Sequence, residues 1–372
     1  MGGPHGDAQV AMRTAFRTDA SSQIGTGHVM RCLTLADAFR EEGTECLFVC
    51  REHNGSLVDH IHSRGYGVHV LTNPGENASS TVDLAHAYWL GVDWQTDADQ
   101  TREALGSEKV DWLIVDHYAL DHRWESTLRT YCKRIMVIDD LADRQHDCDL
   151  LLDQNYGSSA GRYRGLIPPD CVECQGPEYA LLKPVYAELR AQLPQRDGQV
   201  RRVLIYFGGG ADAANLIHLA MRALQAPELI SIELDIVVGA TYAHQSSLDE
   251  LVAQRGKATI HQQLPDLADL MANADLAIGA GGATTWERCC MGVPSIVISI
   301  AENQRPACEA LSAEKQIDYL GHVDQVTSEM IRDRVISLLK NPDILRDMSE
   351  RGMRLVDARG TDRILDEFKA IS

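Results

Sequence analysis

The chain has 372 residues, which is enough for two α/β domains of ordinary size. Its formal net charge of −19 argues against a nucleic-acid or anionic-membrane surface, although a phosphate can still bind locally through backbone amides. The sequence contains no signal-peptide pattern and no run of about 18 apolar residues. We therefore expect no nucleic-acid partner and no membrane partner.

The first predicted elements are a strand, a loop and a helix. Met12–Phe16 is short and rich in apolar residues, and residues 29–40 repeat apolar side chains at helical spacing. The intervening loop contains Gly25, Thr26 and Gly27. These glycines are expected to let the backbone adopt positive φ and come close to a ligand.

His28 falls in the first turn of that predicted helix. Unpaired backbone N–H groups and the helix dipole favour an anion there, and a histidine can accept a proton near neutral pH. The pattern favours a phosphate-bearing substrate and a reaction that needs a base, while a structural role for this histidine stays open. A dinucleotide is disfavoured, because the third glycine of the G-x-G-x-x-G fingerprint would fall at Met30.

The N-terminal half continues with alternating strands and helices. Strands are predicted at Glu45–Cys50, Val68–Leu71, Asp111–Asp116, Arg134–Ile138 and Leu150–Leu152. Helices are predicted at Ser56–Ser63 and Asp121–Cys132, and a turn-rich loop at Pro74–Ser80. Asp116 ends an apolar run, which is typical of a buried parallel strand whose carboxyl end lies at a site; its carboxylate could equally cap the strand.

The alternation restarts after a proline-containing stretch around residues 168–184. Strands are predicted at Arg202–Phe207, Ser231–Val238, Thr259–His261, Leu276–Gly279 and Ser295–Ile298. Helices are predicted at Ala213–Leu224, Gln245–Arg255, Leu267–Asn273 and Thr285–Met291, with mostly helical sequence from Asn303. The pattern predicts an α/β protein with two doubly wound parallel sheets. We expect an N-terminal extension at 1–11, an N-terminal Rossmann-like domain at 12–175, and a C-terminal Rossmann-like domain with terminal helices at 176–372.

A second candidate ligand loop follows the strand that ends at Gly279. It contains Gly281, Gly282, Ala283 and Thr284. The glycines are expected to allow a tight turn, and the N–H groups at the following helix start suit a pyrophosphate. Glu287, about one turn into the helix, can accept hydrogen bonds from two ribose hydroxyls or simply favour the helix dipole. The Gly208–Gly210 loop is equally consistent with ligand contact and with a plain turn.

Ten cysteines occur in the chain, and their spacing indicates no metal site. Cys171 and Cys174 form one C-x-x-C pair without a second pair nearby, whereas a structural zinc needs four ligands. Cys46, Cys50, Cys289 and Cys290 are expected to pack as small hydrophobes, and the cysteine usage indicates a reducing, cytoplasmic compartment. We expect neither a metal nor another cofactor.

The motifs together resemble those of the UDP-2,4-diacetamido-2,4,6-trideoxy-β-L-altropyranose hydrolases of pseudaminic acid biosynthesis. The resemblance runs from Met12 to about residue 320 and rests on residues 21–28, 115–118, 138–143, 146–155 and 302–304. The 281–287 loop is shared more widely, with glycosyltransferase-B enzymes that use UDP-sugars.

The resemblance implies the glycosyltransferase-B fold, with two Rossmann-like domains facing across a cleft and UDP held mainly by the C-terminal one. It implies metal-independent, inverting hydrolysis of a UDP-sugar, with His28 as general base on water and with Tyr118 and Asn303 lining the sugar site. General chemistry agrees with this mechanism. An inverting hydrolysis needs one base, and UDP leaves readily when backbone amides stabilise its charge.

Three alternatives stay open: a glycosyltransferase, a UDP-sugar 2-epimerase, and a non-catalytic UDP-sugar-binding subunit. The sequence also departs from the family. Ala211 stands where a Ser or Thr is common, residues 73–107 are longer than in compact members, and so are the helices beyond residue 325.

Overall fold

The computed structural model describes residues 12–72, 84–157, 161–208, 215–239, 242, 244–262 and 264–371. The expected extension at 1–11, the predicted loop at Pro74–Ser80, and Ala211 lie outside these ranges. The chain divides into two compact units, the first built mainly from residues 28–153 and the second mainly from residue 175 onward.

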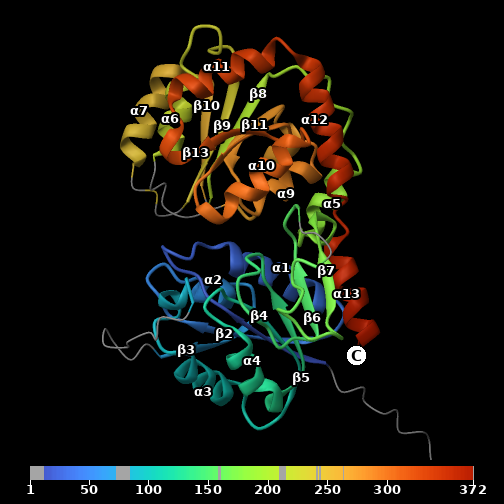
Figure 1. Cartoon of the computed structure of the whole chain (residues 1–372). Helices are drawn as coiled ribbons and strands as arrows, with labels where there is room; N and C mark the ends of the chain where they lie inside the picture. The colour runs from blue at the N-terminus through green and yellow to red at the C-terminus, as the bar shows by residue number, and fades with distance from the viewer. Residues whose placement is uncertain are drawn as a thin grey trace, which may run out of the picture. The chain divides into compact units, whose positions relative to one another are not determined.

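The N-terminal unit is built on a seven-stranded sheet (Figure 1). Its strands are β1 Arg13–Thr18, β2 Glu45–Arg51, β3 Gly67–Leu71, β4 Val110–Asp116, β5 Cys132–Ile138, β6 Leu150–Asp153 and β7 Val172–Gln175. Their order is β3-β2-β1-β4-β5-β6-β7, and the pairs from β3 to β6 are parallel. The central strands are almost wholly buried, as expected when helices cover both faces of a parallel sheet.

Four α-helices and two 3-10 turns accompany this sheet. They are α1 Gly27–Glu41, α2 Val58–Ser63, η1 Ala87–Leu90, α3 Trp94–Leu105, α4 His122–Leu128 and η2 Arg129–Tyr131. Two of the starts have side-chain caps, since Asp93 accepts from the Thr96 amide at 2.8 Å and Asp121 from the Arg123 amide at 3.0 Å.

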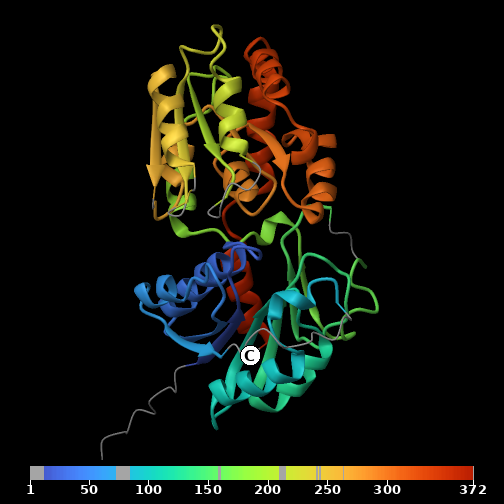
Figure 2. The ribbon, with the colours of Figure 1, turned by 90° about the vertical axis from the view of Figure 1, so that its left-hand side faces the viewer.

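The C-terminal unit contains a six-stranded sheet of order β10-β9-β8-β11-β12-β13, with every neighbouring pair parallel. The strands are β8 Arg202–Tyr206, β9 Glu233–Val238, β10 Ala258–Gln262, β11 Leu276–Ala280, β12 Ser295–Ser299 and β13 Asp318–His322. Within this unit, helices flank the sheet in both views (Figure 1 and Figure 2).

Its helices include several that follow the last predicted strand. They are α5 Pro184–Arg190, α6 Leu216–Ala223, α7 Gln245–Arg255, α8 Ala268–Asn273, α9 Thr284–Cys290, α10 Arg305–Ala313, α11 Ser328–Leu339, α12 Pro342–Leu355 and α13 Gly360–Ile371. The described part of this unit also contains three 3-10 turns: η3 Pro177–Tyr179, η4 Glu302–Gln304 and η5 Val323–Gln325.

The predicted α/β alternation is confirmed in both halves, with two strands missed. β7 was included in an irregular stretch and β13 in a helical one. Both are the last strand of their sheet, and both carry polar residues or glycine, so neither shows the apolar run that identifies a central strand. The helix predicted at 121–132 was too long, because it ends at Leu128 and a 3-10 turn leads into β5.

Each sheet reverses its strand order at one point, between β1 and β4 in the first unit and between β8 and β11 in the second. Ligands of open α/β sheets bind beyond the carboxyl ends of the strands at such a switch point. Most of the predicted site residues follow the ends of β1, β4 and β11.

Candidate functional site

His28 is the second residue of α1 and lies beside the carboxyl end of β4. Its Nδ1 is 2.6 Å from Asp116 Oδ1, and 8% of the residue is exposed. Since the Asp116 carboxylate accepts the Nδ1 proton, the neutral ring presents a lone pair at Nε2. Within the described part of the chain, Nε2 has no hydrogen-bond partner. This is the arrangement of a general base whose tautomer is set by a carboxylate.

Arg31 holds the same carboxylate from one helical turn further along α1. Its Nε donates to Asp116 Oδ2 and its Nη2 to Oδ1, each at 2.6 Å, which is a bidentate pair. Burial opposes ionisation of Asp116, but the charges of Arg31 and His28 outweigh it and hold the pKa of Asp116 below its ordinary value. Asp116 is therefore a fixed acceptor for the imidazole.

Tyr118 is joined to His28 by a continuous set of polar contacts. The Tyr118 hydroxyl donates to Asp140 Oδ1, and Asp140 Oδ2 lies 3.3 Å from Arg31 Nη1. The chain of contacts runs from Tyr118 through Asp140, Arg31 and Asp116 to His28, and we call these five residues the His28 network. The Tyr118 and His28 rings also meet edge to face, with centroids 4.6 Å apart. The structure thus brings together two of the three predicted catalytic residues.

Two further aromatic side chains line the Tyr118 ring. Trp89 stacks on it with centroids 5.5 Å apart, and His86 lies 5.4 Å from it. Burial lowers the pKa of His86, which favours its neutral form. Trp89 and His86 come from a segment of the 73–107 region that the sequence analysis noted as longer than in compact family members.

A second buried charge cluster underlies the end of β1. Arg17 donates to Asp19 at 2.6 Å and to both oxygens of Asp97 on α3, at 3.1 and 2.7 Å. Arg51 on β2 donates to Asp97 at 2.7 Å, and its backbone amide donates to Asp19 at 2.7 Å. His117 Nε2 lies 3.2 Å from Asp19 Oδ2. The cluster joins β1, β2, α3 and the segment after β4 that carries Tyr118.

The glycines of the first loop differ in their roles. Gly25 has φ +81°, as predicted, so a side chain there is strained. Gly27 is the first residue of α1 and does not adopt a positive φ, which corrects that part of the prediction. A Cβ at Gly27 would meet no atom within 4 Å. Packing within the protein therefore does not explain the glycine at position 27.

The second glycine loop connects β11 to α9, and its two glycines differ in the space around them. Neither Gly281 nor Gly282 has positive φ, and the expected turn leads into α9, where the Thr285 amide donates to the Gly282 carbonyl at 2.9 Å. A Cβ on Gly281 would lie 2.3 Å from Cys308 Sγ, whereas at Gly282 the nearest atom would be 3.6 Å away. Gly281 is needed for packing, and Gly282 leaves the loop surface open beside Ala283, which is exposed.

Arg288 lies buried beneath this loop. It donates to the carbonyl of Ala280 at 2.7 Å and to the hydroxyls of Thr284 and Thr285 at 3.1 and 3.0 Å. Among the residues that the structure describes, no carboxylate forms an ion pair with it. Because Thr284 Oγ1 accepts from Arg288, its hydroxyl proton remains available to donate. The sequence pattern predicted no role for Arg288.

Glu287 lies one turn into α9 and is partly buried. Desolvation raises the pKa of its carboxyl to about 7, even though a hydrogen bond from Tyr186 acts in the opposite direction. A carboxyl at this pKa exchanges its proton near neutral pH, and donors that bind it stabilise the ionised form. The side chain is thus suited to accept hydroxyl donors.

Asn303 is in η4, at the carboxyl end of β12, and is exposed. The neighbouring Gln304 accepts from the Ile300 amide at 2.9 Å and so closes the loop. Within the described ranges Asn303 itself has no hydrogen-bond partner. Asn303 and the 281–287 loop belong to the C-terminal unit, and His28 and Tyr118 to the N-terminal one.

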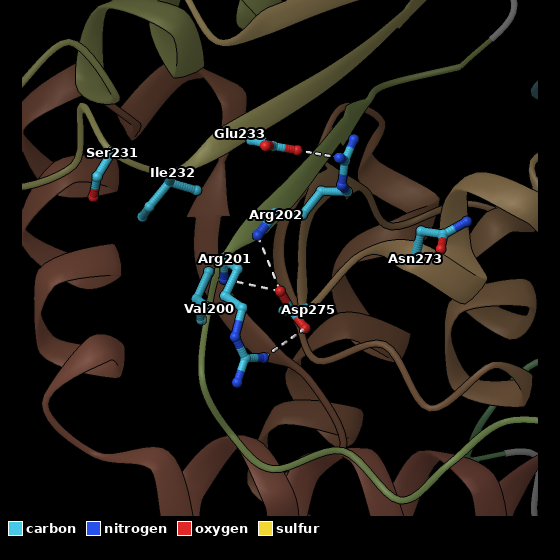
Figure 3. A pocket seen from close by; sticks show the side chains of 8 residues that line it. All are labelled: Val200, Arg201, Arg202, Ser231, Ile232, Glu233, Asn273 and Asp275. Carbon is cyan, nitrogen blue, oxygen red and sulfur yellow. Dashed lines mark hydrogen bonds and ion pairs between the residues drawn. The ribbon is translucent and has the colours of Figure 1, made fainter.

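A cavity of about 520 Å³ lies at the opposite, amino end of the C-terminal sheet. Figure 3 shows its charged groups paired with one another: Glu233 with Arg202, and Asp275 with the backbone amides of Arg201 and Arg202. Because α/β ligand sites form at the carboxyl ends of strands, we do not assign the reaction to this cavity.

The described residues lack both a candidate metal cluster and a candidate membrane-spanning helix. They contain no group of three or more His, Cys, Asp or Glu side chains that could hold a metal ion. They also contain no helix with the length and apolar character of a membrane span.

Sequence reasoning missed the partners of the predicted residues more than the residues themselves. Asp116 was left as a possible strand cap, and Arg31 and Asp140 were not assigned roles. The spacing held a usable signal, because Arg31 is three residues after His28 and so lies on the same helix face. Asp116 and Tyr118 also occur in one motif at a strand end.

The sequence is similar to one protein-family model and to several known proteins. Residues 203–358 match the glycosyltransferase family 28 C-terminal domain. The spore coat polysaccharide biosynthesis protein SpsG of Bacillus subtilis is 25% identical over 355 residues, which cover 95% of this chain and 96% of SpsG. The UDP-2,4-diacetamido-2,4,6-trideoxy-β-L-altropyranose hydrolase of Campylobacter jejuni is 29% identical over 223 residues, 59% of this chain and 69% of that protein.

Among solved structures, MurG of Acinetobacter baumannii aligns with a TM-score of 0.66 at 14% identity, covering 96% of this chain and 99% of MurG. At this identity the likeness concerns the fold alone. The chain thus has the glycosyltransferase-B fold with two Rossmann-like parallel sheets, matches the glycosyltransferase family 28 C-terminal domain over residues 203–358, and is similar to a UDP-sugar hydrolase.

Proposed function

We propose that this protein hydrolyses a UDP-activated 2,4-diacetamido-2,4,6-trideoxy hexose to UDP and the free sugar, as in pseudaminic acid biosynthesis. The observation that carries the proposal is His28 with Nδ1 committed to Asp116 and with Nε2 unpartnered in the described structure. A transferase acceptor or a water molecule could each be deprotonated there. The similarity to the Campylobacter jejuni hydrolase favours water.

In the proposed reaction, His28 takes a proton from water as the water oxygen attacks the anomeric carbon. The bond from that carbon to the UDP oxygen breaks, UDP leaves with the electron pair, and the configuration inverts. Asp116 stabilises the imidazolium that forms, and Arg31 keeps Asp116 ionised. Tyr118 and Asn303 are proposed to contact the sugar or the water.

The UDP half of the site is proposed to be the 281–287 loop, with residues 176–372 as the nucleotide domain and 12–175 as the catalytic domain. Gly282, Ala283 and Thr284 would meet the diphosphate, and Glu287 the ribose hydroxyls. Gly25, Thr26 and Gly27 are proposed to approach the substrate beside His28. Arg288 supplies a buried positive charge under the diphosphate loop.

The test is incubation with candidate UDP-sugars in water and no acceptor, followed by proton NMR. The altro, gulo and gluco isomers of the diacetamido sugar are tried in turn, with UDP-N-acetylglucosamine for comparison. Release of UDP and a free sugar of inverted anomeric configuration is expected for one isomer. An altered UDP-sugar indicates an epimerase, and turnover that requires an acceptor indicates a transferase.

A binding subunit is separated by the same assay. UDP that binds by calorimetry without turnover of any candidate would contradict the proposal. Oxygen-18 water gives an independent readout, because attack at carbon places the heavy oxygen in the sugar and not in UDP.

A further inference from the structure

The hydroxyl group of Tyr118 already donates its proton in a hydrogen bond within the protein. A phenol has one proton to donate, and here Asp140 Oδ1 receives it. Asp140 is itself held by Arg31, whose Nη1 lies 3.3 Å from the other carboxylate oxygen, and 13% of the Asp140 side chain is exposed. In this arrangement the Tyr118 oxygen can accept a hydrogen bond from a ligand but cannot donate one.

The ring of Tyr118 has little freedom to change this arrangement. Trp89 stacks on it, His28 meets it edge to face, and the guanidinium of Arg144 lies 5.8 Å from its centroid. The residue is 6% exposed. Burial and the adjacent Asp140 charge raise the pKa of Tyr118 well above its ordinary value, so the proton stays on the phenol.

Two acceptors then belong to rings that meet edge to face with centroids 4.6 Å apart: the Nε2 lone pair of His28 and the oxygen of Tyr118. A water molecule has two protons, and two neighbouring acceptors fix its orientation, whereas one acceptor leaves it free to rotate. Resting on the hydrolysis proposed above, we infer that Asp140 is a positioning residue: by taking the Tyr118 proton, it makes Tyr118 an acceptor that orients the attacking water for His28.

The step is balanced without another reactant. One water proton passes to His28 Nε2, and the other stays on the oxygen and is held by Tyr118 until the new bond to the anomeric carbon forms. That oxygen lone pair is the nucleophile, and UDP departs with the electrons of the broken bond. The alternative partner for Tyr118 is an acetamido N–H of the sugar, which the experiment separates by its effect on KM.

The experiment is a double-mutant cycle on Tyr118→Phe and Asp140→Asn, assayed with UDP-2,4-diacetamido-2,4,6-trideoxy-β-L-altropyranose. The side-chain amide introduced by Asp140→Asn can donate to the Tyr118 oxygen, which reverses the hydrogen bond and leaves the phenol proton to face the ligand. Each single variant is expected to lower kcat by about 10–100-fold, the order of loss from a misplaced reacting group, with KM unchanged within about threefold. The double variant is expected to match Tyr118→Phe alone.

A matched control is Tyr66→Phe, which removes another hydroxyl that donates to a carboxylate, Asp37 Oδ1 at 2.7 Å. This control is expected to keep the wild-type kcat. Thermal unfolding and calorimetric UDP binding are measured for every variant, so that a folding defect is distinguished from a loss of turnover.

The inference is overturned if the two single effects multiply in the double variant, if Asp140→Asn keeps wild-type kcat, or if KM rises in place of the fall in kcat. The last result assigns Tyr118 to the sugar. His28→Ala is assayed in the same series. If it remains active, the proposed function itself fails, whereas an inactive His28→Ala beside a fully active Asp140→Asn removes only the role of Asp140.

Discussion

At the residue scale, the chemistry depends on which atom carries each proton. Asp116 is a buried acceptor that two donors share, His28 from one side and Arg31 from the other. Because Arg31 stays charged, Asp116 cannot withdraw from the imidazole by taking up a proton of its own. The Nδ1–H tautomer of His28 is therefore a consequence of three side chains, of which the sequence motif showed only the histidine.

The first prediction separates the base from the group that orients it. His28→Ala is expected to abolish turnover and Asp116→Asn to lower kcat by about 10²–10⁴-fold, the range typical of general-base catalysis. UDP affinity is expected to stay within about tenfold of wild type in both, since neither side chain is proposed to bind the diphosphate. Steady-state kinetics and UDP calorimetry check this, and a parallel loss of binding and activity would contradict it.

The second prediction concerns Glu287 and pH. The pKa of about 7 means that the carboxyl is largely protonated at pH 6 and ionised at pH 8. If ribose hydroxyls donate to the ionised form, affinity for UDP-N-acetylglucosamine should be about tenfold higher at pH 8 than at pH 6. The diphosphate diester of this probe has no proton to lose in that range, so the probe itself does not titrate.

Glu287→Gln is the control for that prediction. It is expected to bind more weakly at pH 8, by about 1.5–3 kcal/mol, and to show no dependence on pH over the same range. An equal pH dependence in wild type and variant would rule out the ribose role.

At the element scale, the two sheets bring together residues that are far apart in sequence. His28 and Asp116 are 88 positions apart and meet because β1 and β4 are parallel neighbours whose carboxyl ends lie at one edge. The turn into α1 and the turn into α9 both follow switch-point strands. The topology of the two sheets thus determines the position of both loops, independently of which side chains they carry.

The third prediction compares the two glycines of the first loop. Position 27 has an ordinary φ and open space around its Cα. Gly27→Ala is therefore expected to leave the free energy of unfolding unchanged or to raise it by at most about 1 kcal/mol. Gly25→Ala forces a side chain into φ +81° and is expected to destabilise by about 1–2 kcal/mol. Urea unfolding measures both.

Activity then distinguishes the reason for the glycine at position 27. If the substrate approaches the backbone there, Gly27→Ala should raise KM for the UDP-sugar by tenfold or more despite its normal stability. A stable variant with wild-type KM would exclude Gly27 from the binding surface.

The strand–helix alternation, the switch-point loops and the position of His28 at a helix start could be predicted from sequence, because apolar periodicity and glycine placement are local signals. The edge strands β7 and β13 could not, since their polar residues are tolerated at the margin of a sheet. The spacing of Arg31 from His28 was a local signal for one partner, but the contacts of Asp116 and Asp140 were identifiable only from the register and topology of the sheet. The expectation of positive φ was wrong at Gly27, and at Gly281 the structure adds a reason that the sequence did not show, the close approach of Cys308.

At the scale of the whole molecule, buried charge contributes to stability as well as to chemistry. Arg17, Arg51 and Asp97 are fully buried and joined by hydrogen bonds between β1, β2 and α3. Burial opposes ionisation of Asp97, but Arg17 and Arg51 outweigh it and lower the pKa of Asp97. Removing one member leaves an uncompensated charge, which is the costly event for such clusters.

The fourth prediction tests this cluster. Asp97→Asn is expected to lower the free energy of unfolding by about 3–5 kcal/mol. Asp99→Asn, on the same helix, removes an exposed ion pair to Arg102 and should cost at most about 1 kcal/mol. Urea denaturation at pH 7 measures both, and equal effects would contradict the argument.

The fifth prediction follows from the sign of these shifts. Asp19, Asp97, Asp116 and Asp139 all have pKa values below the ordinary value in the folded chain. Below about pH 4 the unfolded chain binds protons that the folded chain rejects, so stability present at neutral pH is lost as pH falls. Thermal unfolding between pH 3 and 7 should show this decline, with a shallower slope in Asp97→Asn.

The position of His28 and Arg31 one turn apart on α1 has a consequence for motion. Both side chains bind one carboxylate at the end of β4, so the imidazole of His28, the proposed base, cannot move independently of the helix that carries it. Any rearrangement during turnover must move α1 and β4 as a rigid pair or release three hydrogen bonds at once. Conformational changes that gate the catalytic cycle are therefore expected in other segments. Relaxation-dispersion NMR should detect no conformational exchange of the His28 ring on the millisecond timescale.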